Sequence, residues 1–349
     1  MSSIKRVHNM RYMWVDYAKA IGIILVVFGH VNRGLHSSGI SVSNLFFAKI
    51  DSIIYSFHMP LFFFLSGLFF VSSIEKSTKK NFILNKINTI FYPYVIWSLL
   101  QGGTEVILSK YTNAKTNIIE VLSFPFHPRA QFWFLYALLM IFIFACIIYH
   151  HKLFIKTLPI IILASLIGYL FSNKIGTHLH VDYITKNIVF FFIGCLFNLY
   201  KNILQKLFST SSLFLFLFLF LFLCSQYLFH LYYKMNYTQT GIFTFWLAII
   251  SICLIINLSI KLSDTDIHWL RKIGELSMVI YLMHILAGSG ARIILSKVFH
   301  IDNWYVHITF GTLIGIVAPV VFYYITGKTR MVFLFNSPYQ QFKKIKNNQ

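Results

Sequence analysis

The chain has 349 residues, of which 57% are hydrophobic and 11% are charged, and its mean hydropathy is +0.70. These values exclude an ordinary soluble globular protein and are typical of an integral membrane protein. The formal net charge is +20, but the basic residues cluster in the segments between apolar stretches, so we expect no nucleic-acid partner.

Ten apolar stretches have the length that a helix needs to cross a bilayer. They lie near residues 12–31, 51–73, 88–108, 131–149, 153–172, 183–200, 210–231, 241–262, 273–296 and 304–326. With a cytoplasmic N-terminus, the inner segments hold 19 Lys and Arg residues and the outer segments hold 10, which is the positive-inside pattern. The sequence therefore predicts an all-α bundle of about ten transmembrane helices, multi-pass in the cytoplasmic (inner) membrane, with both termini cytoplasmic.

The basic residues of the loops therefore indicate the topology of the chain. We expect anionic lipids to be the partner that these residues bind. We expect residues 1–330 to form a single transmembrane domain and residues 331–349 to form a basic cytoplasmic tail. The four cysteines lie inside the apolar stretches without metal-ligand spacing. Neither a disulfide framework nor a zinc site is therefore expected.

The first apolar stretch carries three ionisable side chains on one face. At 100° per residue, Asp16, Lys19 and His30 fall within about 60° of one another around the helix. Such groups cost roughly 2.5–3.5 kcal/mol each in a bilayer on insertion scales, and they normally face a bundle interior or a wet cavity. Snorkelling and helix capping would account for Lys19 and Asp16 alone. With His30 on the same face, the pattern indicates a functional stripe.

The second stretch runs inward from the outer surface and contains His58, Pro60 and the pair Ser66 and Gly67. We expect His58 to lie a few residues below the surface, at about the depth of His30, so that the two histidines can meet. Pro60 frees a backbone carbonyl, and Ser66 provides a small polar spot deeper in the helix. These features are typical of a helix that lines a cavity. The alternative is a proline kink with an interfacial histidine.

The third stretch is unusually polar for a membrane helix, with Pro93, Gln101, Gly102, Gly103 and Glu105. Broken backbone hydrogen bonds are tolerated at membrane depth only against protein or a water-filled cavity. Lys86 lies just before this stretch. The sequence therefore predicts that Lys86 can meet an anionic cofactor at the inner end of a cavity.

Two later stretches are expected to carry no chemistry. His178, His180 and Asp182 alternate as metal ligands on a strand would, but the motif is short and has no clear fourth ligand, so we expect no metal. Residues 211–224 alternate Leu and Phe, which defines no wet face. That stretch is predicted to be a helix facing lipid.

The ninth stretch again carries a narrow polar stripe. Ser277, Tyr281 and His284 occupy positions i, i+4 and i+7 of one helical face. His284 falls about 16 Å along this helix, close to the membrane midplane. A single midplane histidine is usually an interhelical hydrogen-bond partner. Together with His30 and His58, it indicates a shared cavity.

These blocks resemble the membrane acyltransferase-3 family, and within it the sugar O-acetyltransferases of the fucose 4-O-acetylase type. The resemblance is carried by Asp16-Tyr-Ala-Lys19 followed by His30, Phe57-His58-Met-Pro60-Leu-Phe-Phe-Phe-Leu-Ser66-Gly67, Trp133-Phe-Leu-Tyr136, Phe192-Ile-Gly194 and Gly274-Glu-Leu-Ser277-Met-Val-Ile-Tyr281-Leu-Met-His284. The blocks run in order from the first span to the ninth. Lys19 stands where the wider family more often has arginine.

The resemblance implies an O-acyltransferase that moves an acetyl group from acetyl-CoA to a hydroxyl of a glycan or lipid-linked sugar. Such a transfer needs a base near the hydroxyl and a donor for the developing oxyanion. His30 is the expected base or transient acyl carrier, and His58 or Tyr281 is expected to stabilise the oxyanion. The expected catalytic set is His30, His58, Tyr281 and His284, and the set expected to bind acetyl-CoA is Lys19, Lys86, Asp16 and Ser66.

Two other classes of function compete with this one. A transporter or flippase of lipid-linked sugars would use intramembrane His, Lys and Asp as a proton relay. Transporters of that kind contain inverted repeats, and the histidine blocks at 30, 58 and 284 have no partners at matching offsets. A purely structural subunit would leave the polar stripes unexplained.

Overall fold

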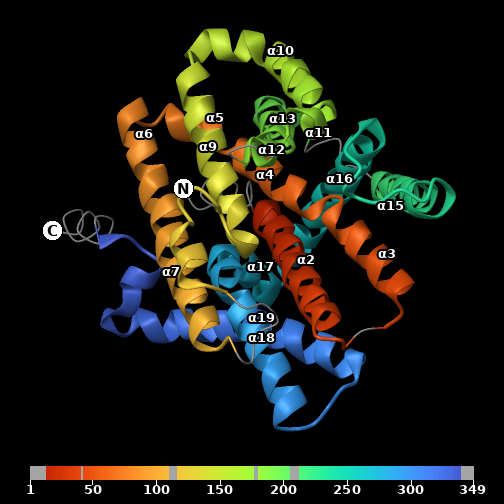
Figure 1. The fold of residues 1–349 in the computed structure, drawn as a ribbon. Helices are drawn as coiled ribbons and strands as arrows, with labels where there is room; N and C mark the ends of the chain where they lie inside the picture. The colour runs from red at the N-terminus through yellow and green to blue at the C-terminus, as the bar shows by residue number, and fades with distance from the viewer. Residues whose placement is uncertain (1–12, 41, 110–115, 177–179, 205–211, 339–349) are drawn as a thin grey trace.

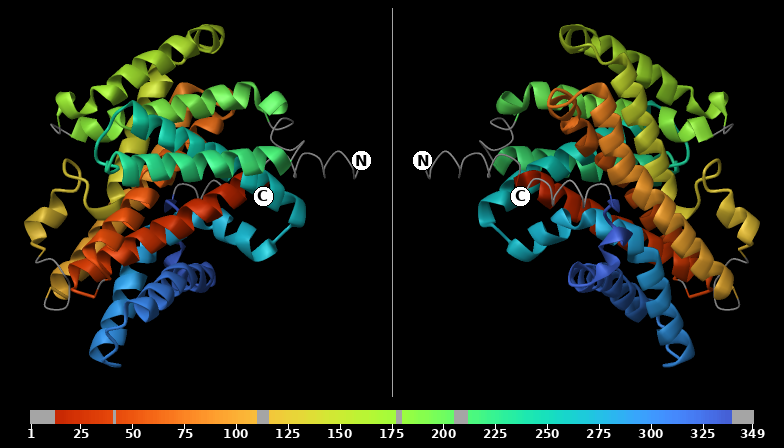
Figure 2. Two further views of the ribbon diagram at one scale, coloured as in Figure 1. Left: turned by 90° about the vertical axis from the view of Figure 1, so that its right-hand side faces the viewer. Right: turned by 90° about the vertical axis from the view of Figure 1, so that its left-hand side faces the viewer.

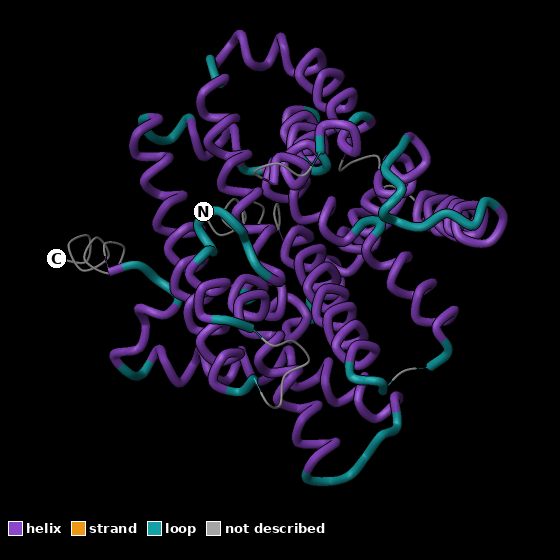
Figure 3. The backbone as a smooth tube through the Cα atoms, viewed as in Figure 1, coloured by secondary structure: helices purple, strands orange, loops and turns teal. Residues whose placement is uncertain are grey.

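The computed structural model describes residues 13–40, 42–109, 116–176, 180–204 and 212–338. Every regular element in these ranges is a helix (Figure 3). The prediction of an all-α protein is therefore confirmed for the part of the chain that is described.

Nine helical segments of the described residues are long and apolar enough to cross a membrane. They are α2 (Met13–Ser37), α3 with α4 (Asn44–Tyr55 and His58–Leu68), η2 with α9 (Ala130–Phe132 and Trp133–Ile148), α10 (His151–Leu170), α12 with α13 (Val181–Thr185 and Ile188–Leu199), α15 with η4 (Ser212–Tyr227 and Leu228–Tyr232), α16 (Ile242–Thr265), α18 (Ser277–Lys297) and α19 (Trp304–Gly327). The protein is therefore a multi-pass membrane protein.

The shorter helices connect or flank these segments. They are α5 (Phe70–Ile74), α6 (Lys79–Lys86), η1 (Ile87–Phe91), α7 (Tyr92–Ile107), α8 (Ile118–Leu122), α11 (Ser172–Ile175), α17 (His268–Glu275) and η5 (Arg330–Leu334). The tenth expected span, at 88–108, forms η1 and α7. It is not among the nine, although α6, η1 and α7 are continuous from Lys79 to Ile107, because polar residues such as Asn88, Gln101 and Glu105 lower its hydropathy.

Helix α2 lies at the centre of the bundle and packs against α3, α4, α16, α17, α18 and α19 (Figure 1). Its apolar residues Tyr17, Ile23 and Val27 are completely buried. Figure 2 shows α18 and α19 together beneath α2. The helix that carries Asp16, Lys19 and His30 therefore faces protein around most of its circumference.

The second span begins at Asn44 rather than at 51, and it is interrupted between α3 and α4. His58 therefore lies deeper along this span than a start at 51 implies. Pro60 occupies the first turn of α4, where a missing N–H removes no intrahelical hydrogen bond. The interruption leaves the carbonyl oxygen of Ile54 2.7 Å from His58 Nδ1.

Glycines allow the closest helix contacts in the bundle. A Cβ at Gly67 on α4 would collide with the backbone carbonyl of Phe191, and a Cβ at Gly194 on α13 would collide with that of Phe64. Gly274 on α17 lies in the same way against the backbone of Asp16 on α2. Small residues permit such backbone contact between membrane helices. These glycines therefore permit the close packing of α4 on α13 and of α17 on α2.

Helix α15 lies at the edge of the bundle (Figure 1). Its Leu and Phe side chains are largely exposed, including Leu213, Phe216, Phe220 and Leu223. This arrangement agrees with the helix facing lipid that the sequence predicts, except that residue 211 lies outside the described residues.

The chain beyond α19 returns to α7. The indole Nε1 of Trp97 donates to the carbonyl of Leu334 (2.8 Å), and the Ser337 hydroxyl donates to Asn88 Oδ1 (2.6 Å). The beginning of the expected tail therefore packs on the bundle. Residues 339–349 lie outside the described residues.

Candidate active site

The polar stripe of α2 begins with an ion pair. The Lys19 ammonium donates to Asp16 Oδ1 at 3.2 Å, one helical turn away. Each side chain is about a third exposed, at 33% and 27%. The pairing lowers the cost of placing Lys19 in an apolar helix. Asp16 thus holds the Lys19 ammonium, and only Lys19 of the two lines the neighbouring cavity.

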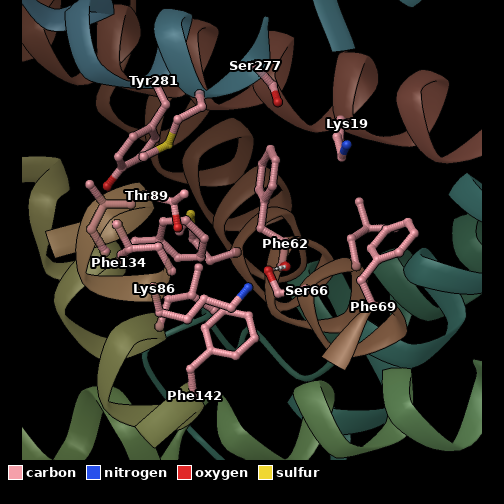
Figure 4. Close-up of a pocket in the computed structure, with 16 residues that line it drawn as sticks. Lys19, Phe62, Ser66, Phe69, Lys86, Thr89, Phe134, Phe142, Ser277 and Tyr281 are labelled. Carbon is pink, nitrogen blue, oxygen red and sulfur yellow. Dashed lines mark hydrogen bonds between the residues drawn. The ribbon is translucent and has the colours of Figure 1, made fainter. Parts of the chain in front are cut away.

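A cavity of about 440 Å³ lies between α2, α4, α9, α18 and the α6–η1 segment (Figure 4). We call it the lysine cavity. Its walls are mostly apolar, and its polar lining comes from Lys19, Ser66, Lys86, Thr89, Ser277 and Tyr281. Its volume lies in the usual range for small-molecule sites, about 300–1,000 Å³. Of the residues expected to bind acetyl-CoA, the structure brings Lys19, Ser66 and Lys86 together here.

Lys86 supplies the second cation of the lysine cavity. It ends α6, just before the polar segment of η1 and α7, and its ammonium lies 4.0 Å from the centroid of the Phe142 ring. It forms no ion pair with any described residue. Burial lowers the pKa of Lys86 to about 8. An anion that entered the cavity would stabilise the charged form of Lys86.

A second cavity of about 220 Å³ lies further along α2 and α18. We call it the histidine cavity. Its polar lining includes His30, Arg33, His284, Ser289, Arg292 and His307. The ring centroids of His30 and His284 are 5.1 Å apart. The structure thus joins two of the four expected catalytic residues in one cavity.

The hydrogen bonds of two buried histidines fix which nitrogen carries the proton. His284 Nδ1 lies 2.8 Å from the carbonyl oxygen of Tyr281, and His58 Nδ1 lies 2.7 Å from that of Ile54. A carbonyl oxygen only accepts, so each Nδ1 must donate. The Nε2 atom of each neutral ring then carries a lone pair, and neither Nε2 has a partner among the described residues.

Tyr55 separates His30 from His58. Its ring centroid is 6.1 Å from that of His30 and 4.5 Å from that of His58. The side chain of Tyr55 therefore lies between the two histidines that were expected to meet. Gly29 makes the approach possible, because a Cβ there would lie 3.0 Å from the Tyr55 ring.

Arg33 holds Tyr55 in this position. Its guanidinium lies 3.2 Å from the Tyr55 ring centroid and forms two hydrogen bonds to Asp51, at 2.6 and 2.8 Å. It also donates to the Tyr237 hydroxyl at 2.7 Å. Bidentate pairing and ring stacking are both suited to the planar guanidinium.

The two groups that were expected to donate to an oxyanion already donate to other acceptors. Tyr281 donates its hydroxyl proton to the carbonyl of Gln131, and neutral His58 donates through Nδ1. The buried hydroxyl of Tyr55, by contrast, has no hydrogen-bond partner among the described residues. Tyr55, Arg33 and Arg292 are site residues that sequence reasoning missed. The signal that could have identified Arg33 was its position three residues after His30, on a helix that continues to Ser37.

Helix α18 lines both cavities. Tyr281 lines the lysine cavity and His284 lines the histidine cavity, and their ring centroids are 6.0 Å apart. Helix α2 follows the same order, with Lys19 in the first cavity and His30 in the second. These two residues are about 16 Å apart along a straight helix. The lysines and the histidines therefore lie in successive cavities along both helices.

The described residues contain no group of three or more His, Cys, Asp and Glu side chains that could hold a metal ion. His178 lies outside the described residues. The ring of His180 instead lies beside His127, with Nδ1 of His127 3.2 Å from Nε2 of His180.

Part of this sequence is similar to that of a known protein from a bacterium. The nodulation protein NolL of Sinorhizobium fredii is 27% identical over 135 residues, which is 39% of this chain and 36% of that protein. The chain thus spans about a third of the length of this relative. No solved structure matches the chain.

A family model described as an acyltransferase domain, Acyl_transf_3, matches residues 12–324. The match covers most of the chain and extends from the start of α2 into α19, so that it includes both cavities. This protein belongs to the acyltransferase-3 family of membrane acyltransferases.

Proposed function

We propose that the protein is an O-acetyltransferase that moves an acetyl group from cytoplasmic acetyl-CoA to a hydroxyl of a cell-surface or lipid-linked glycan. The observation that carries this proposal is that Tyr281 and His284, one turn apart on α18, line two different cavities. One cavity is apolar with two lysines, and the other contains a pair of histidines. A thioester donor and a hydroxyl acceptor need those two environments.

The lysine cavity suits the donor. The Lys19 and Lys86 ammonium groups attract the phosphates of coenzyme A, while the apolar walls accept the pantetheine arm. Ser66 donates its proton to the carbonyl of Phe62 (2.8 Å), so its oxygen remains an acceptor toward the cavity. The thioester end then points toward Tyr281 and His284.

The histidine cavity suits the acceptor. The acceptor oxygen attacks the thioester carbon, the carbon–sulfur bond breaks, and the hydroxyl proton passes through His30 to the leaving thiolate. When His30 is protonated, the lone pair of His284 Nε2 stabilises the imidazolium beside it. The uncommitted Tyr55 hydroxyl is the donor proposed for the oxyanion.

Mass spectrometry of surface and lipid-linked glycans tests this function. Cells that contain the protein are compared with cells that lack it and with cells that contain the His30→Ala variant. We expect acetyl esters on a glycan only with the wild-type protein. Identical glycan acetylation in all three would contradict the proposal.

A further inference from the structure

The histidine cavity contains a cation that the acetyl-transfer scheme does not use. Arg292 lies on α18, is half-buried, and lines the cavity together with His30 and His284. It follows His284 by eight residues, which is about 12 Å along a helix. Arginine side chains on helices lean toward the N-terminal turn, which brings the guanidinium of Arg292 back toward His284.

The charge of Arg292 is not balanced by the residues described. The other arginine of the cavity, Arg33, is paired with Asp51. Among the described residues, no Asp or Glu lines the cavity, and Arg292 takes part in no ion pair or hydrogen bond. The cavity therefore presents an excess of positive charge from Arg292 next to the proposed base.

An unpaired guanidinium in a membrane helix is costly unless it reaches water or an anion. Its planar fork matches the two oxygens of a carboxylate or phosphate group. The hydroxyl of Ser289 lies in the same cavity, one turn before Arg292, and adds a neutral hydrogen-bonding group for a sugar. Arg292 is thus suited to bind an anion at a fixed distance from the reacting hydroxyl.

We propose that Arg292 binds an anionic group of the acyl acceptor and thereby selects acidic glycans or sugars linked to a lipid through phosphate. This inference rests on the proposed function, because it names the acceptor of that reaction. The spacing of Arg292 from His284 places the anion on the reacting sugar or on the unit next to it. A neutral glycan would leave the guanidinium unpaired in the cavity and would bind weakly.

Binding of three probes to the purified, detergent-solubilised full-length protein tests this proposal. The probes are a disaccharide containing glucuronic acid, the methyl ester of the same disaccharide, and decyl phosphate. Thermal unfolding is followed as a function of probe concentration, because a ligand of the native state raises the midpoint. The acid and its ester differ only in the charge that Arg292 is proposed to recognise.

We expect the acid, decyl phosphate, or both to bind about tenfold or more tightly than the ester, as for a charge-assisted pair. The probe that binds more tightly shows whether the site prefers a sugar carboxylate or a lipid phosphate. Arg292→Gln should remove the preference, and Arg292→Lys should keep part of it. Lys297→Gln, an exposed charge on the same helix outside the cavity, is the matched control and should keep all of it.

Equal binding of acid, ester and decyl phosphate by the wild-type protein would overturn the proposal. A preference that survives in Arg292→Gln would also overturn it, because another group would then bind the anion. Acetyl transfer is measured separately, as release of free coenzyme A from acetyl-CoA. Failure of that assay would contradict the proposed function, whereas the probe comparison reports on the anion site alone.

Discussion

The imidazole rings of His30 and His284 lie 5.1 Å apart between centroids, although the residues are far apart in sequence and belong to α2 and α18. His284 Nδ1 donates to its own helix, so that its Nε2 lone pair remains unused. The pair lines the histidine cavity, and the ring of His284 lies 6.0 Å from that of Tyr281, which lines the lysine cavity. The proposed chemistry depends on this pair acting as a unit.

Substitution of either histidine by alanine should reduce kcat about 100-fold or more, because general-base catalysis contributes about 10²–10⁴. The double variant should be about as slow as the slower single variant, since residues that act as a unit are not additive. Acetyl transfer by the three purified proteins measures this. If the losses of kcat in the two single variants multiply in the double variant, the two histidines act independently. His268→Ala, on the exposed part of α17, is the control and should keep full activity.

Tyr55→Phe should lower kcat about tenfold and leave KM for acetyl-CoA unchanged. The change removes only the unpartnered hydroxyl and keeps the ring between His30 and His58. An oxyanion donor acts in the transition state and not in substrate binding. Tyr305→Phe, at an exposed position of α19, should have no effect. A normal kcat for Tyr55→Phe would assign the oxyanion to another group.

The pKa of Lys86, lowered to about 8 by burial, predicts a pH dependence of donor binding. Lys86 is charged below that pKa and neutral above it, so KM for acetyl-CoA should be constant near pH 7 and rise as the pH passes about 8. Lys86→Arg should remove this rise, because arginine stays protonated throughout. Initial rates between pH 6.5 and pH 9.5, a range of roughly three units around that pKa, measure the effect.

Lys86→Gln should raise KM for acetyl-CoA roughly tenfold at neutral pH, as expected for loss of a hydrogen bond to a charged group. Lys80→Gln is the matched control, because Lys80 is exposed on the same helix and lies outside the cavity. The same KM in both variants would remove Lys86 from donor binding.

Gly67→Ala should destabilise the protein by about 3 kcal/mol or more, because the added methyl group meets the backbone carbonyl of Phe191. Gly103→Ala is the control. Gly103 also lies within a helix, but nothing is within 4 Å of its Cβ position, so alanine there should be neutral or slightly stabilising. Thermal unfolding in detergent compares the two. Similar midpoints would show that α4 and α13 can separate at little cost.

Much of the architecture follows from local sequence. Runs of apolar residues long enough to cross a bilayer predict the helices, and the alternating Leu and Phe of residues 211–224 predict a helix facing lipid. The break before His58 was signalled by Pro60. The start of that span at Asn44 was not, because Lys49 interrupts the apolar run just before residue 51.

The contacts between distant segments are what local sequence cannot specify. His30 and His284 share a face with other polar groups in their own helices, but the glycine contacts that bring helices together depend on the whole bundle. Gly67, Gly194 and Gly274 belong to the blocks that resemble the family, and the structure gives them packing roles. Tyr55 and Arg292 gave no periodic signal, since their importance depends on partners on other helices.

The most direct test of the account is the sidedness of the reaction in sealed vesicles that contain the protein in one known orientation. The lysine cavity and the histidine cavity lie in succession along α2 and α18, so we expect donor and acceptor to enter from opposite faces. Acetyl-CoA is supplied on one face and the glycan acceptor on the other, and acetylated glycan is measured. Transfer in this arrangement is the predicted result. Transfer only when both substrates are on the same face would contradict the account.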